Sequence, residues 1–116
     1  MRNPSTMSFG TDLASDRAKP PAHLSRQAKR WWRSVLDAYY LEPHRVAILT
    51  AAAEAWDRKE QARLIIAQEG IVIRVGRGTP MPHPAVQVED AAAMRFAKLV
   101  HEIGLAATSS SEVRLP

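Results

Sequence analysis

The sequence predicts a mainly α-helical protein in which three helices and a small β-hairpin form one domain. Three stretches carry apolar residues at helical spacing, and prolines and glycines mark where helices begin and end. A fourth, shorter stretch is β-branched and bounded by glycines, which is typical of a hairpin. The 116 residues suit a single domain. We expect a flexible arm over residues 1–19, a folded domain over 20–105 and a flexible tail over 106–116.

The first helix is predicted over residues 25–40. Ser25 is a good N-cap, and Pro20-Pro21 cannot continue a helix upstream. One face is apolar and contains Leu24, Ala28, Trp31, Trp32, Val35, Leu36 and Tyr39. The other face is basic and contains Arg26, Lys29, Arg30 and Arg33. The apolar face therefore suits a protein core, which is where we place both tryptophans, and the basic face suits an anion.

The second helix is predicted from Pro43 to about Glu69, roughly 40 Å at 1.5 Å per residue. One apolar stripe contains Leu49, Ala53, Trp56, Leu64 and Ala67, and a second contains Ile48, Ala52, Ala55, Ala62 and Ile66. Each apolar stripe requires its own packing partner, either another helix of the chain or a neighbouring subunit. We expect the first helix to pack antiparallel on one of them, and we assign the second stripe to an oligomer interface. The alternative is a central helix that is buried within one subunit.

The hairpin and the third helix follow. Ile71 to Val75 forms the first strand, Gly76-Arg77-Gly78 the turn, and Thr79 to Met81 the returning strand, which Pro82 is expected to end. The third helix is predicted from Pro84 to Ile103, before Gly104. Its core face contains Val88, Ala92, Phe96, Leu99 and Ile103. The predicted architecture is thus an antiparallel helix pair with a long central helix, a small hairpin and a third helix.

The net charge of +4 is concentrated near the amino end. Residues 1–45 contain eight Lys and Arg against four Asp and Glu, whereas residues 46–116 contain eight of each. Such a positive field attracts nucleic acid or an acidic protein surface. The candidate DNA-binding residues are Arg26, Lys29, Arg30 and Arg33 of the first helix, with Arg17 and Lys19 of the arm. The alternative is a solvated helix face.

Enzymatic and membrane functions find no support in the sequence. The four histidines match no zinc-site or catalytic spacing, and there is no cysteine. The Gly76-Arg77-Gly78 turn lacks the Gly-Lys-Ser/Thr ending of a phosphate-binding loop. No apolar run approaches the roughly 18 residues of a membrane span. We therefore predict no catalytic residue, metal or cofactor, and a location in the cytoplasm.

A family resemblance covers roughly residues 19–114. Its features are KPPAHLSRQAKRWWRSVLDAYYLEPHR, a long alanine-rich helix ending in EG, a hairpin closing on HPA, and a helix ending RFAKLVHEIGLAATSS. The chain resembles the small subunits of tailed-phage terminases, in the short branch with a Pro-Pro and Leu-Ser start and a Trp-bearing first helix. In this sequence Ala106, Ala107, Thr108 and Glu112 replace much of the Pro-Ser and arginine pattern that follows the Gly-Leu in relatives.

The resemblance implies a ring-shaped homo-oligomer in the host cytoplasm. It would recognise the packaging-initiation site of double-stranded viral DNA and deliver this DNA to the terminase large subunit, the ATPase motor and nuclease. Residues 20–105 would then be an oligomerisation and DNA-binding domain. Two other functions stay open from the residues themselves: a small DNA-binding regulator that acts as a dimer, and a structural adaptor between protein partners.

Overall fold

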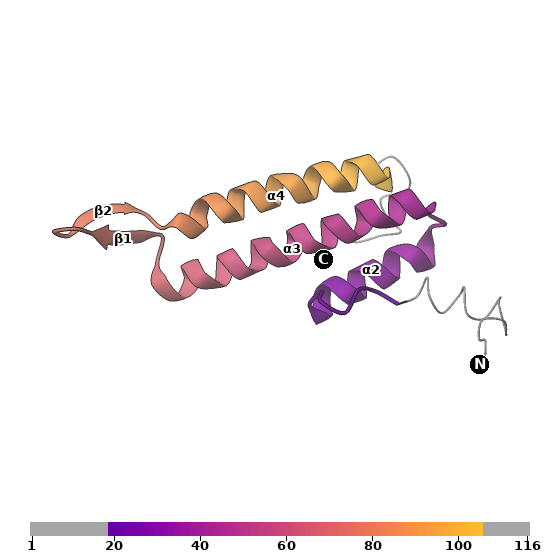
Figure 1. Cartoon of the computed structure of the whole chain (residues 1–116), viewed down its shortest axis with the longest axis horizontal. Helices are drawn as coiled ribbons and strands as arrows, with labels where there is room; N and C mark the ends of the chain where they lie inside the picture. The colour runs from indigo at the N-terminus through magenta and orange to yellow at the C-terminus, as the bar shows by residue number, and fades with distance from the viewer. Residues whose placement is uncertain (1–18, 106–116) are drawn as a thin grey trace, which may run out of the picture.

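Three helices and one hairpin make up the computed structural model, which describes residues 19–105 (Figure 1). Helix α2 (Arg26–Ala38) is followed by the long helix α3 (Pro43–Glu69). Strands β1 (Val72–Val75) and β2 (Thr79–Pro82) form an antiparallel hairpin, and helix α4 (Pro84–Ile103) returns along α3. The mainly helical fold with a two-stranded hairpin is confirmed.

The elements divide the molecule into two ends. Helix α2 lies against α3 away from the hairpin, so that all three helices meet there (Figure 1). The hairpin projects beyond the last turn of α3 and the first turn of α4. Helix α3 contacts α4 along most of its length and contacts α2 over a shorter stretch. The principal helix pair is therefore α3 with α4, and α2 adds a third side to it.

Local sequence signals set the helix ends. The Ser25 hydroxyl accepts a hydrogen bond from the Ala28 N–H at 3.1 Å, which caps the start of α2. Pro43 and Pro84 occupy first-turn positions of α3 and α4, where no N–H is needed. Gly104 ends α4 in the left-handed conformation, at φ 91°. Helix α2 ends at Ala38, two residues before the predicted end, because Tyr39 is already extended at φ −134°.

Aromatic side chains from all three helices form the centre of the core. The rings of Trp31 and Trp56 each lie 5.4 Å from the ring of Phe96, at tilted angles that aromatic pairs favour. Trp32 is also buried, and its Nε1–H donates to the Thr50 hydroxyl at 3.1 Å. The two adjacent tryptophans of α2 thus fix this helix to the pair of α3 and α4, as the apolar face of α2 predicted.

The second stripe of α3 is largely covered within the chain. Ala52, Ala55 and Ala62 are 0%, 4% and 2% exposed. These three alanines have almost no surface left for a neighbouring subunit in the folded chain. Ile48 and Ile66 are only half-buried, so the expected oligomer interface keeps accessible residues at these two positions alone. The arrangement of the alanines matches the alternative of a central helix enclosed by its own chain.

The hairpin has a register that explains why β2 tolerates two prolines. Val72 pairs with Pro82 and Arg74 with Pro80, whereas Ile73 pairs with Met81. One step beyond, the His83 N–H donates to the Ile71 carbonyl at 2.8 Å. Hydrogen-bonded and non-bonded pairs alternate in an antiparallel ladder, so both prolines fall in non-bonded pairs and their nitrogens face outward. Strand β2 therefore continues through Pro82, where the sequence had predicted its end.

Candidate nucleic-acid interface

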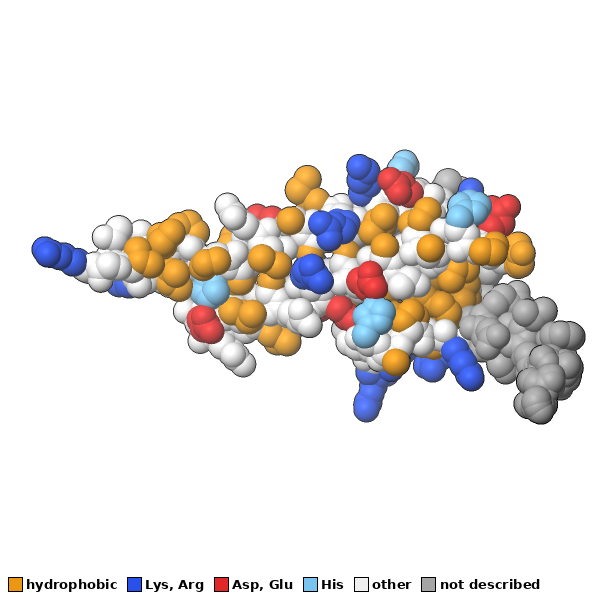
Figure 2. Space-filling view, viewed as in Figure 1, with side chains coloured by type: hydrophobic (Ala, Val, Ile, Leu, Met, Phe, Trp, Pro, Cys, Tyr) orange, Lys and Arg blue, Asp and Glu red, His pale blue; other side chains and the backbone are white. Residues whose placement is uncertain are grey.

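The basic face of α2 is the structural counterpart of the predicted DNA-binding residues. Because Ala28, Trp31, Trp32 and Val35 are buried, the opposite side of this helix faces solvent. Arg26, Arg30 and Arg33 are exposed there, and Lys29 is half-buried. Figure 2 shows Lys and Arg side chains projecting from the side of the molecule that α2 forms. The structure brings all four predicted helix residues onto one accessible face.

Three of these cations form no ion pair with the described part of the chain. Within residues 19–105, Arg26, Lys29 and Arg30 make no salt bridge, while Lys59, Arg63 and Arg45 lie within 4 Å of carboxylates. Lys19 is exposed at the start of the described chain, and Arg17 lies outside the described residues. Unpaired guanidinium groups keep their full capacity to donate to phosphate oxygens, so this face can contact a nucleic-acid backbone.

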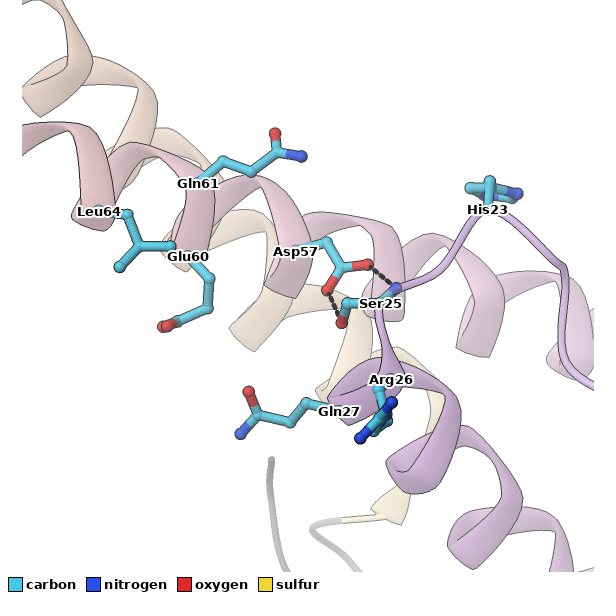
Figure 3. Close-up of a pocket in the computed structure, with 8 residues that line it drawn as sticks. All are labelled: His23, Ser25, Arg26, Gln27, Asp57, Glu60, Gln61 and Leu64. Atoms are coloured by element: carbon cyan, nitrogen blue, oxygen red, sulfur yellow. Dashed lines mark hydrogen bonds between the residues drawn. The ribbon is translucent and has the colours of Figure 1, made fainter.

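The amino end of α2 is held by α3. Asp57 of α3 accepts hydrogen bonds from the Ser25 N–H at 2.7 Å and from the Ser25 hydroxyl at 2.5 Å (Figure 3). His23, just upstream, lies 2.7 Å from the Glu54 carboxylate through its Nε2. Two contacts between segments about 30 residues apart therefore fix the position and direction of α2. No pattern in the sequence indicated these contacts, because Asp57 and Glu54 resemble ordinary surface residues of α3.

The same contacts determine which part of α2 can receive an anion. Asp57 already supplies a carboxylate to the positive end of the helix dipole. The adjoining groove, of about 500 Å³, is also lined by Glu60, Gln61 and Leu64 (Figure 3). A phosphate at this end would meet two carboxylates, so the geometry favours contact along the lateral face that carries Arg26, Lys29 and Arg30.

Most basic residues of α3 serve structural contacts. Glu60 receives Lys59 at 2.7 Å and Arg63 at 3.0 Å, and these hydrogen bonds, that of Lys59 above all, lower the pKa of the Glu60 carboxyl. Lys59 Nζ also lies 3.9 Å from the centre of the Trp56 ring. Arg45 Nη1 donates to the Ile103 carbonyl at 2.7 Å, which binds the carboxyl end of α4 to α3. These cations are not available to a ligand in the way those of α2 are.

A second depression lies on α3 and α4, with a volume of about 560 Å³. Its lining combines the apolar Ala51, Met94 and Leu99 with the charged Arg95, Lys98 and Glu102. Both signs of charge occur here, and the two cations belong to a helix with a nearly balanced composition. The depression offers a weaker positive field than α2, which makes Arg95 and Lys98 useful as a comparison for the α2 residues.

The histidines and carboxylates of the described chain form no metal-binding cluster. Among residues 19–105, no three His, Asp or Glu side chains gather closely enough to hold a metal ion. His83 is the one buried polar residue there, and its Nδ1 caps α4 by accepting from the Ala85 N–H at 3.0 Å. The position of His83 immediately before Pro84, a first-turn residue, is the sequence signal for this cap. None of the helices within residues 19–105 combines the length and the hydrophobicity of a transmembrane segment.

The fold and this surface define a small helical protein that presents a basic helix on its outside. Comparison with protein families shows to which family this small helical protein belongs. The model of the family described as phage terminase, small subunit, matches residues 28–116, and the chain belongs to this family. No curated protein and no solved structure matches the chain. The resemblance drawn from the sequence motifs is confirmed.

Proposed function

We propose that this terminase small subunit recognises double-stranded viral DNA at the packaging start site and delivers it to the terminase large subunit. In this proposal it acts in the host cytoplasm as a ring-shaped homo-oligomer and has no catalytic role of its own. Membership of the family supports the role in packaging. The observation that carries the DNA contact is the accessible basic face of α2, on which Arg26, Lys29 and Arg30 have no ion-pair partner within residues 19–105.

Contacts to phosphate predict a defined dependence on salt. Each neutralised phosphate contributes about 0.9 units of slope to the logarithm of affinity against the logarithm of salt concentration. The double variant Arg26→Ala/Arg30→Ala should therefore weaken binding across DNA sequences and reduce the slope by up to about two units for each engaged subunit. Fluorescence anisotropy at several salt concentrations measures both quantities.

A matched control removes the same charge elsewhere. Arg95→Ala/Lys98→Ala also deletes two exposed cations, but from α4, and should leave the slope nearly unchanged. Circular dichroism and native mass measurement confirm that both variants are folded and assembled. Equal slopes for the two double variants would contradict the assignment of DNA contact to α2, and Lys19 with Arg17 would become the next candidates.

The two alternative functions predict different results in the same measurements. A DNA-binding regulator that acts as a dimer would bind DNA with a comparable salt slope but would have a native mass of two subunits. A structural adaptor would show no DNA affinity at physiological salt. A native mass above two subunits together with a steep salt slope supports the terminase role over both.

A further inference from the structure

We propose that the outer edge of β1 pairs with the same edge of a second copy of this chain, about a two-fold axis. The two hairpins then form one four-stranded sheet in the order β2, β1, β1, β2. This inference goes beyond the proposed function, because it concerns contact between copies and does not depend on DNA. It names β1 as an interaction surface that the helix patterns did not indicate.

The two edges of the hairpin differ in their ability to accept another strand. Ile71 and His83 form a hydrogen-bonded pair, and hydrogen-bonded pairs alternate with non-bonded pairs along an antiparallel ladder. The N–H and C=O groups of Val72 and Arg74 therefore face away from β2. The corresponding positions of β2 are Pro80 and Pro82, which have no N–H to donate. The β1 edge is therefore open, and the β2 edge is blocked at two successive outward positions.

Apolar side chains around this edge lack a cover within the described chain. Ile71 is 63% exposed and Val72 is 51% exposed, and Val75 and Met81 are exposed as well. Val88, in the second turn of α4 and placed in the core by helical periodicity, is also exposed. Figure 2 shows hydrophobic side chains gathered at this end of the molecule. A two-stranded hairpin is only marginally stable by itself, so an added strand would stabilise it.

A second copy can pair with the outward N–H and C=O groups of β1 in one particular register. With Ile73 opposite Ile73 of the second copy, Val72 faces Arg74 on each side, and each such pair exchanges two hydrogen bonds. No arginine stands directly opposite another, and the Arg74 guanidinium bends back to its own turn, where Nη1 donates to the Gly78 carbonyl at 2.9 Å. The register also brings the two Ile73 side chains into contact as a close, non-bonded pair.

The prolines explain why this assembly stops at two copies. In the four-stranded sheet both outer edges are β2, and neither edge can extend the ladder. A ring requires each subunit to join two different surfaces head to tail, whereas the β1 edge joins to itself. The β1 contact is thus additional to any ring contacts, and it links copies two by two.

The absence of cysteine from the sequence allows a direct test by disulfide trapping. In the proposed sheet, residue 73 lies opposite its own copy with Cβ atoms about 4.5–5.5 Å apart, close to the range of a disulfide after a small adjustment. The variant Ile73→Cys should form a covalent dimer under mild oxidation. In the control variant Thr79→Cys the two β2 strands are about 14 Å apart, three strand spacings, so no dimer should form. No dimer with Ile73→Cys, or equal yields from both variants, would overturn the proposal.

A second test blocks the open edge without changing the ladder inside the hairpin. Arg74→Pro removes an outward N–H, as Pro80 and Pro82 already do on β2, and Arg74→Ala controls for the lost side chain. The β1 contact is proposed to link two copies, or two rings, that no other contact joins, so the native mass of Arg74→Pro should be half that of Arg74→Ala. Equal masses would contradict the β1 contact. Because neither variant changes α2, retained DNA binding with equal masses would reject this inference while leaving the proposed function intact.

Discussion

The helical end and the hairpin end of this molecule differ in how they bury their apolar residues. Where α2 meets α3 and α4, the rings of Trp31 and Trp56 both pack against Phe96. Leu49 and Val35 are fully buried there. At the hairpin end, Ile71, Val72, Met81 and Val88 are large apolar residues that stay exposed. Burial follows the number of elements that meet, three helices at one end and two strands at the other. The helical end can fold by its own contacts, and the hairpin end gains most from a partner.

The largest expected effect is at Ala52, which is fully buried within the chain. Ala52→Glu places an unpaired carboxylate in the core, which costs several kcal/mol and should abolish the helical circular dichroism signal. Val72→Glu makes the same change at the exposed hairpin end and should leave that signal nearly intact. If Ala52→Glu loses assembly but keeps its helix content, the second stripe of α3 is an interface between subunits after all.

An intermediate effect on stability is expected at His83, which joins the hairpin to the start of α4. His83 Nδ1 accepts from the Ala85 N–H, so its Nε2 carries the proton and donates to Glu69 at 2.7 Å. His83→Ala removes the cap of α4 and should lower the free energy of unfolding by about 1 kcal/mol. His83→Asn offers a carbonyl oxygen to the same N–H and should recover much of this loss. Urea denaturation measures both, and equal stabilities for the two variants would exclude a capping role.

The smallest effect concerns the surface of α3. Hydrogen bonds from Lys59 and Arg63 lower the folded-state pKa of Glu60 below its ordinary value of 4.5. A lowered pKa means that the ionised group stabilises the fold above pH 4.5, and that this contribution disappears as the pH falls through the folded-state pKa. Glu60→Gln should cost less than about 1 kcal/mol at pH 7, and the difference from the wild type should vanish in acid. The exposed Glu102, changed to Gln, is the control; a constant difference across the pH range would contradict the pairing.

The helices were predictable because their ends are set by neighbouring residues. Pro43, Pro84 and Gly104 act within one turn of the helix end that each one marks, so α3 and α4 have the predicted bounds. The basic face of α2 was predictable for the same local reason. Periodicity cannot tell which stripe is covered by the same chain, because alanines pack closely against either kind of partner. Leu64 and Val88 show this limit, since both belong to predicted core stripes and both are exposed.

Contacts between distant residues were the part that the sequence could not supply. Asp57 caps the start of α2 from 32 positions away, and Arg45 binds the end of α4 from 58 positions away. These pairs depend on the angle at which the helices cross, which no local pattern encodes. The position of Pro82 inside β2 is a third case, because only the ladder register shows that its nitrogen faces outward.

The placement of the tryptophans decides which events optical spectroscopy can detect in this protein. All three, Trp31, Trp32 and Trp56, lie in or against the helical core, and β1 and β2 contain none. Intrinsic fluorescence therefore reports on the seating of α2 and gives almost no signal from the hairpin. A ligand that shifts α2 should change the emission, whereas joining two hairpins should leave it constant. An unchanged emission spectrum during assembly would accordingly be the expected result, and a fluorophore attached at the hairpin would be needed to follow that step.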